Sequence, residues 1–151
     1  MTSSASAPSP AGPASIEVRR RVEWSDTDAA GHHHNTAVLR WLEEAETVLH
    51  ERLGIVEQTF GRTPRVRLEI DFTERLYFRD IVVIRLEVAA VGRTSLTYSF
   101  EVARDGTVAA RGRLVVVNAA AGEGAEPWPG ELRHALAQAG PQPGEYLSGT
   151  P

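Results

Sequence analysis

The sequence contains no cysteine and no lysine, and each absence narrows the chemistry open to the chain. Without cysteine it can form no disulfide, no cysteine-rich zinc site and no thiol nucleophile. Without lysine it can form no Schiff base with a substrate. The net charge is −4, so no broad basic field is available to attract nucleic acid, and we expect no nucleic-acid partner.

Long apolar runs are also missing. None reaches the roughly 18 to 20 residues that a membrane-spanning helix needs, and the N-terminus has neither the basic region nor the apolar core of a signal peptide. We therefore expect no membrane span and a cytoplasmic protein.

Proline is scarce in the middle of the chain, where Pro64 is the single example between residues 16 and 118. Residues 1–15 are mostly Ser, Ala and Pro, which predicts a disordered leader. Residues 119–151 predict a Pro/Gly/Ala-rich tail in which 131–139 favour a short helix. The predicted domain, 16–118, is small enough that association with a second copy would help its stability.

Hydrophobic periodicity predicts the elements of this domain. Apolar residues recur every three or four positions over 37–53, which predicts an amphipathic helix capped by Asn35 or Thr36 and ended by Gly54. Period-two patterns predict strands at 16–24, 65–72, 81–91, 96–102 and 108–117, and Asp105-Gly106 predicts a tight hairpin turn. The fold class expected is α+β, with one long helix across an antiparallel sheet of about five strands.

The loop before the helix holds the motif Asp26-Thr-Asp28-x-x-Gly31-His32-x-x-Asn35, followed on the helix by Leu-Arg-Trp-Leu-Glu at 39–43. In these residues the chain resembles the hotdog-fold thioesterases of the 4-hydroxybenzoyl-CoA thioesterase and acyl-CoA thioesterase superfamily. The resemblance implies a long central helix wrapped by the sheet, a homodimer or homotetramer with its site at a subunit interface, and hydrolysis of an acyl-CoA or acyl-carrier-protein thioester. It also implies that Asp28 is the catalytic carboxylate.

Elementary chemistry agrees with that role for Asp28. A carboxylate can attack a thioester or activate water, and unpaired backbone N–H groups at a helix start, here around 34–37, can polarise the carbonyl. The other candidate catalytic residues are His32, His34 and Asn35, and the candidate substrate-binding residues are Gly31, Thr36, Trp41 and Arg93. Further arginines that could hold phosphates are Arg62, Arg75 and Arg79, and residues that could shape the acyl pocket are Val38, Leu42, Tyr77, Phe78 and Tyr98. We expect neither a metal nor a cofactor.

Several alternatives stay open. The chain could be a non-catalytic module that binds acyl thioesters on the same fold. It could be a hydroxyacyl-thioester dehydratase that pairs His32 with Glu43 or Glu44. The three consecutive histidines could hold a metal together with Asp28, although the predicted sheet supplies no second ligand pair. Asp26 could simply cap its turn. The acyl group, aromatic or aliphatic, does not follow from the residues.

Overall fold

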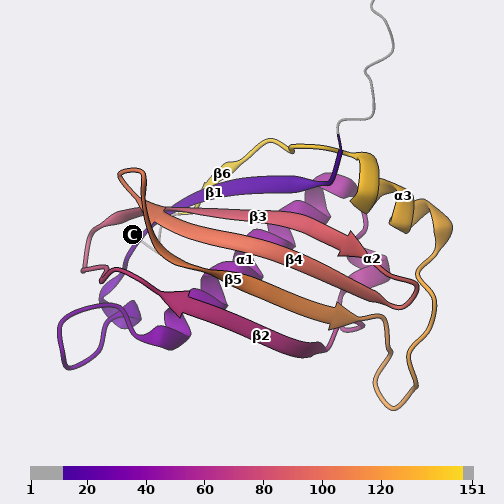
Figure 1. The fold of residues 1–151 in the computed structure, drawn as a ribbon, viewed down its shortest axis with the longest axis horizontal. Helices are drawn as coiled ribbons and strands as arrows, with labels where there is room; N and C mark the ends of the chain where they lie inside the picture. The colour runs from indigo at the N-terminus through magenta and orange to yellow at the C-terminus, as the bar shows by residue number, and fades with distance from the viewer. Residues whose placement is uncertain (1–11, 148–151) are drawn as a thin grey trace, which may run out of the picture.

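Six strands form one sheet in the order β2-β5-β4-β3-β1-β6 in a computed structural model, which describes residues 12–147 (Figure 1). The first five strands pair antiparallel, and β6 runs parallel to β1. Their bounds are Ser15–Arg21 for β1, Arg65–Phe72 for β2, Ile81–Val91 for β3, Ser95–Arg104 for β4, Thr107–Val117 for β5 and Glu145–Leu147 for β6. The expected count of about five strands was therefore one too few, because β6 is only three residues long and carries no periodicity to read.

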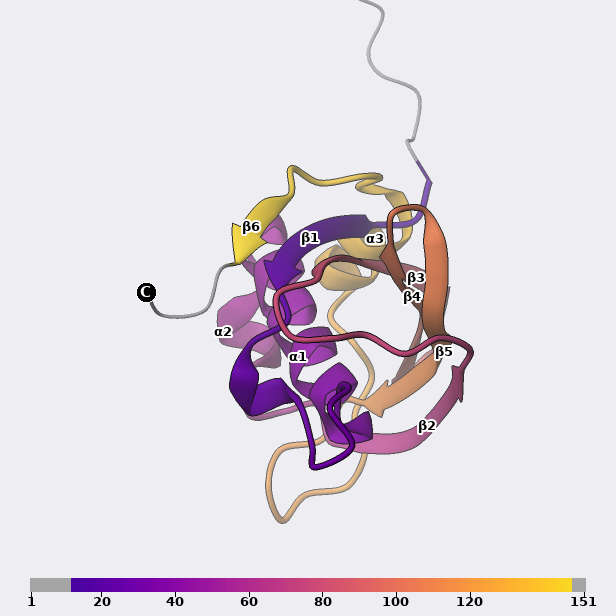
Figure 2. The ribbon, with the colours of Figure 1, turned by 90° about the vertical axis from the view of Figure 1, so that its left-hand side faces the viewer.

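The long helix α1, Asn35–Leu53, lies against the inner face of the curved sheet (Figure 2). It buries one face of apolar side chains in a core shared with β1, β3 and β4: Ala37, Val38, Trp41, Leu42, Ala45, Val48 and Leu49. The other helices are short: η1 is Trp24–Asp26, α2 is Val56–Thr59 and α3 is Gly130–Gln138. Within residues 12–147, every helix is too short or too polar to cross a membrane.

Both ends of α1 are fixed by local chemistry. At the C-terminal end Gly54 adopts a φ of 70°, the left-handed conformation expected there. At the N-terminal end the prediction that Asn35 or Thr36 caps the helix was wrong. Both residues are already helical, and His34 has the extended backbone of a cap, with its Nδ1 accepting the Thr36 N–H at 3.1 Å.

The predicted hairpin between β4 and β5 is present. Asp105 and Gly106 both have positive φ, 50° and 79°, which is the backbone of a two-residue turn matched to strand twist. On β5, Gly112 pairs with Ile70 of β2, and a Cβ at this position would lie 1.8 Å from the backbone oxygen of Glu69. The close approach of β2 to β5 therefore depends on glycine.

Two predictions about strand burial were wrong. The first strand ends at Arg21, and Trp24, expected in its apolar register, is 74% exposed on η1. The alternation of apolar and charged residues over 65–72 is the pattern of a strand with one buried face, yet Val66, Leu68 and Phe72 are 57%, 38% and 46% exposed. A pattern identifies an amphipathic strand but does not say what covers it, and β2 is an edge strand whose single neighbour in the sheet is β5.

Segments outside 16–118 also contribute to the core. On the N-terminal side of residue 16, Ala14 is buried and Ser15 starts β1. Residues 1–11 of the expected disordered leader lie outside the described part of the chain. After it, Trp128, Leu132 and Leu136 are buried, and the Trp128 indole donates to the Ser95 carbonyl at 2.9 Å. The segment after residue 118 thus packs α3 against β3 and adds β6 to the sheet.

Candidate active site

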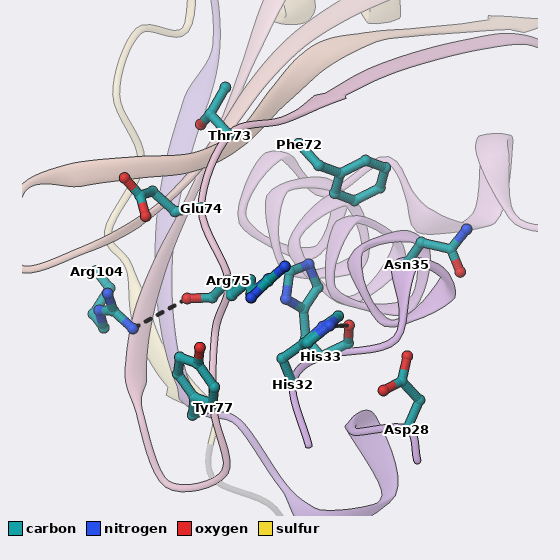
Figure 3. Close-up of a pocket in the computed structure, with 10 residues that line it drawn as sticks. All are labelled: Asp28, His32, His33, Asn35, Phe72, Thr73, Glu74, Arg75, Tyr77 and Arg104. Carbon is teal, nitrogen blue, oxygen red and sulfur yellow. Dashed lines mark hydrogen bonds between the residues drawn. The ribbon is translucent and has the colours of Figure 1, made fainter. Parts of the chain in front are cut away.

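A cavity of about 780 Å³ opens beside the N-terminal end of α1 (Figure 3). Three segments meet there: the loop before α1 with the first residue of that helix, the end of β2 with the loop that follows it, and the end of β4. The side chains that line it are Asp28, His32, His33, Asn35, Phe72, Thr73, Glu74, Arg75, Tyr77 and Arg104.

Asp26 holds the loop in place. Its carboxylate is 3% exposed and accepts hydrogen bonds from the Glu23 backbone at 2.8 Å, from Arg40 at 2.7 Å and from Arg20 at 3.4 Å. Its carbonyl accepts the His34 N–H at 2.7 Å. The interpretation that Asp26 caps its turn is correct in part, since its bond with the Glu23 N–H closes η1. Its ion pairs with Arg20 and Arg40 also make it a buried ionic centre.

Asp28 lines the cavity and is half-buried. Its Oδ1 accepts the Ala30 N–H at 2.9 Å, and within residues 12–147 its Oδ2 has no hydrogen-bond partner. The chain turns back here through Gly31, whose φ of +89° favours glycine and whose N–H donates to the Asp28 carbonyl at 3.0 Å. Gly31 therefore shapes the loop and does not line the cavity. One oxygen of Asp28 is therefore held by the loop, and the other has no partner among residues 12–147.

Few backbone donors remain free at the start of α1. Of the four N–H groups expected to polarise a carbonyl, that of His34 donates to Asp26, that of Thr36 to the His34 ring, and that of Ala37 to the His34 carbonyl. The N–H of Asn35 has no partner in the described part of the chain, and the Asn35 side chain lines the cavity. The helix start thus offers one backbone donor rather than four.

Two histidines line the cavity, and the sequence pointed to one of them. His32 was predicted, and its Nδ1 donates to the His33 carbonyl at 3.2 Å. His33 was missed because nothing in a run of three histidines tells which ring faces inward. It is 6% exposed, its Nδ1 accepts the Leu76 N–H at 3.1 Å, and its ring lies 6.3 Å from Trp41 and 5.9 Å from Phe72.

Burial lowers the pKa of the His33 imidazole below its usual 6.5, and the neighbouring His32 ring lowers it further. The Asp28 carboxylate acts in the opposite direction, and His34 adds a smaller lowering. His33 is therefore neutral at pH 7. Because the Leu76 N–H donates to Nδ1, the ring proton lies on Nε2.

Besides Gly31, four of the predicted site residues lie away from the cavity lining. His34 and Thr36 are exposed and bonded to each other at the helix cap, with 2.7 Å between the His34 Nδ1 and the Thr36 hydroxyl. Trp41 is fully buried between Arg20 and His33, and its indole nitrogen has no partner in the described range. Arg93 lies in the turn after β3, on the order of 30 Å along the strand from the cavity.

The cationic side chains at the cavity are Arg75 and Arg104 rather than the predicted Arg93. Arg75, one of the further candidates, lines it, whereas Arg62 pairs with Glu126 and Arg79 is exposed. Arg104 also lines it and was missed, because its place at the end of β4 depends on sheet order. It donates to Asp80 at 2.7 Å and to the Arg75 carbonyl at 3.2 Å, and the bond to Asp80 raises the pKa of its guanidinium.

The remaining predicted groups separate into different environments. Of the pocket-shaping candidates Tyr77 lines the cavity, Phe78 is exposed against Trp24, and the buried core contains Val38, Leu42 and Tyr98. Glu44 pairs with Arg20, and Glu43 lines a separate cavity of about 690 Å³, so within one chain neither carboxylate faces His32 as a dehydratase would need. Among residues 12–147, no three His, Asp or Glu side chains are grouped to hold a metal ion.

Comparison with known proteins places these features in a family context. The family model described as thioesterase-like superfamily matches residues 22–136. A predicted thioesterase from Bacillus stearothermophilus is 30% identical, with a TM-score of 0.73 over 81% of this chain and 93% of that one. A gentisyl-coenzyme A thioesterase is 27% identical, with a TM-score of 0.70 over 80% of this chain and 98% of that one.

A substituted 4-hydroxybenzoyl-CoA thioesterase solved with 4-hydroxybenzoyl-CoA has a TM-score of 0.73 over 82% of this chain and 99% of that one. At 20% identity it shows a shared fold alone. No curated protein matches the chain.

Proposed function

We propose that this chain hydrolyses an acyl-CoA or acyl-carrier-protein thioester. The chain belongs to the thioesterase-like superfamily and shares the hotdog fold of thioesterases, and both findings support a thioester hydrolase. Asp28 is the carboxylate that acts as nucleophile or general base, and the backbone N–H at the start of α1 polarises the thioester carbonyl. The products are a free acid and a thiol.

One observation carries this proposal: Asp28, with one unpartnered oxygen, and Asn35, with an unpartnered N–H, border the same cavity. A thioester placed between them would have its carbonyl carbon near a carboxylate and its oxygen near a donor at the positive end of a helix. That arrangement brings together the two elements that acyl transfer requires.

Either role of Asp28 balances chemically. As nucleophile, its Oδ2 adds to the carbonyl carbon, the C–S bond breaks, the leaving thiolate takes a proton from water, and a second water hydrolyses the acyl-aspartyl anhydride. As general base, it takes a proton from water, the resulting hydroxide adds to the carbonyl carbon, and the departing thiolate receives that proton. Rapid quench followed by mass spectrometry distinguishes the routes, since only the first adds the acyl mass to the peptide that contains Asp28.

Arg75 and Arg104 support a phosphate-bearing thiol as the leaving group. Both line the cavity that contains Asp28, and guanidinium groups bind phosphate oxygens well. Coenzyme A and the phosphopantetheine arm of a carrier protein share this chemistry. Comparing the same acyl group on the two carriers would separate these sources.

The exposed apolar side of β2 supports a homodimer. Its edge presents unpaired backbone groups, and its exposed Val66 and Leu68 would be covered if a second copy paired antiparallel along it. Phe72 lies on this strand and also lines the cavity, so the partner would border the site. The two β2 strands would then lie with the Arg65 end of one beside the Phe72 end of the other.

The test is thiol release from aryl-, short-chain and medium-chain acyl-CoAs and from the matching acyl-carrier proteins. We expect release from at least one substrate class. A protein that binds these thioesters without releasing thiol from any of them would be the non-catalytic module. In that case Asp28 would only stabilise its loop through the hydrogen bond from the Ala30 N–H.

A further inference from the structure

We propose that His33 is a second catalytic residue, whose neutral Nε2–H donates a hydrogen bond to the thioester carbonyl oxygen. This inference rests on the proposed function and deepens it, because it assigns the donor that the helix start does not supply. The site would then hold the developing negative charge between the Asn35 backbone N–H and the His33 ring.

The need for a second donor follows from the helix start itself. Oxyanion sites commonly use two converging donors, and the loss of one costs on the order of 10²- to 10³-fold in rate. Here the N–H groups of His34, Thr36 and Ala37 are already bonded within the fold. The Asn35 N–H is the remaining one of the four, so a side chain has to complete the pair.

His33 is fixed in the form that this role requires. Its backbone N–H donates to the Leu76 carbonyl at 2.7 Å, and its ring Nδ1 accepts the Leu76 N–H at 3.1 Å. A ring nitrogen that accepts a hydrogen bond has no proton, so the neutral ring has its proton on Nε2. Nδ1 is turned toward Leu76, which leaves Nε2 as the ring nitrogen that can reach a ligand in the cavity.

Packing keeps the ring in this position. His33 is buried, and its ring lies 6.3 Å from Trp41. It also lies 5.9 Å from the Phe72 ring and 6.1 Å from the His32 ring, both of which are drawn in Figure 3. The rings of Trp41 and Phe72 belong to α1 and β2, so two separate elements hold the imidazole. A donor held in place before the substrate arrives needs no reorganisation during the reaction.

The chemistry of the step is donation without proton transfer. As the nucleophile adds to the carbonyl carbon, the C=O electron pair moves onto oxygen, and the Nε2–H···O bond strengthens. When the C–S bond breaks, the pair returns and the bond weakens, with the proton still on Nε2. A lowered imidazole pKa agrees with this because it keeps the ring neutral at pH 7.

Two substitutions separate the two nitrogens of His33. In His33→Asn the amide oxygen takes the place of Nδ1 and can still accept the Leu76 N–H, while the donor at Nε2 is gone. In His33→Gln the amide nitrogen reaches the place of Nε2 and can still donate. With a thioester that the native protein hydrolyses, we expect kcat to fall about 10²-fold in His33→Asn with KM within about twofold, and to recover at least tenfold in His33→Gln.

A second measurement does not depend on the variants folding. The imidazole ¹⁵N signals of the native protein should show His33 neutral with its proton on Nε2. That Nε2–H resonance should move when a ketone analogue of the accepted acyl-CoA, with methylene in place of sulfur, is bound. A structural histidine would show neither the shift nor the rescue by glutamine.

The outcomes are distinguishable. Full kcat in a folded His33→Asn variant of an active protein, or a ring proton on Nδ1, would overturn the role of His33 and leave the proposed hydrolysis standing. Failure of the native protein to release thiol from any thioester would overturn both. A kcat loss in His33→Asn, partly restored in His33→Gln, supports the inference.

Discussion

Replacing Asp26 by Asn should destabilise the protein while leaving a folded active site at low temperature. The carboxylate of Asp26 is almost fully buried and binds Arg40, Arg20 and the Glu23 N–H. The isosteric amide keeps one acceptor oxygen and loses the charge, so Arg40 loses its counterion and Arg20 keeps only Glu44.

The size of the effect follows from the partners. Breaking a buried ion pair by removing one partner costs about 3 to 5 kcal/mol. Arg40 is half exposed and can turn to water, and Arg20 keeps its bond to Glu44, so we expect a smaller loss of about 2 to 3 kcal/mol. For a domain of this size each kcal/mol corresponds to roughly 2 to 4 °C, which gives a Tm lower by about 4 to 12 °C.

Thermal and urea denaturation of the native protein, Asp26→Asn and Glu44→Gln would measure this. Glu44 is the matched control, since its carboxylate is 43% exposed and its bond to Arg20 should contribute less than about 1 kcal/mol. A Tm for Asp26→Asn within about 1 °C of the native value would refute the assignment of Asp26 as the ionic centre of the loop.

Three further predictions test other parts of the structure. Gly112→Ala should lower the Tm by several degrees, because its Cβ would sit 1.8 Å from the Glu69 oxygen and β2 would have to move; an unchanged Tm would contradict the close approach. Leu68→Glu should shift the protein from dimer to monomer in light scattering, and a dimer of unchanged affinity would rule out pairing along β2. Burial lowers the pKa values of His33 and His50 below 6.5, the value expected in the unfolded chain. Their contribution to the free energy of unfolding is therefore complete above pH 6.5 and is lost as the pH falls through the lowered folded-state values. Urea denaturation at pH 7.5 and 5.5 should show this loss, at most about 1.4 kcal/mol per pH unit for each histidine, and equal stability at both would contradict it.

Local patterns were sufficient for much of the fold. The three-and-four spacing predicted α1, which begins two residues earlier than expected, and Asp105-Gly106 predicted the hairpin through the positive φ that both residues adopt. These features depend on a few neighbouring residues, so the local sequence is sufficient to predict them. The family resemblance, carried by the loop motif, was confirmed for the same reason.

Features that depend on distant neighbours were not predictable. The exposure of β2 follows from its place at the sheet edge, and the position of Arg104 at the cavity follows from the order of the strands. His33 is distinguished from its two neighbours by its bond to Leu76, which is 43 residues away. No local pattern contains that contact.

The most direct test of the central proposal is kcat/KM of Asp28→Asn on the thioester that the native protein hydrolyses, measured beside the Tm of both proteins. Asp28 is half-buried and bonds one backbone N–H of its own loop through Oδ1, so the amide should leave the Tm nearly unchanged. A loss of at least about 10²-fold in kcat/KM is the result that a nucleophile or general base predicts. Full activity in a folded Asp28→Asn protein would contradict the account and move the carboxylate role to Glu43 or Glu44.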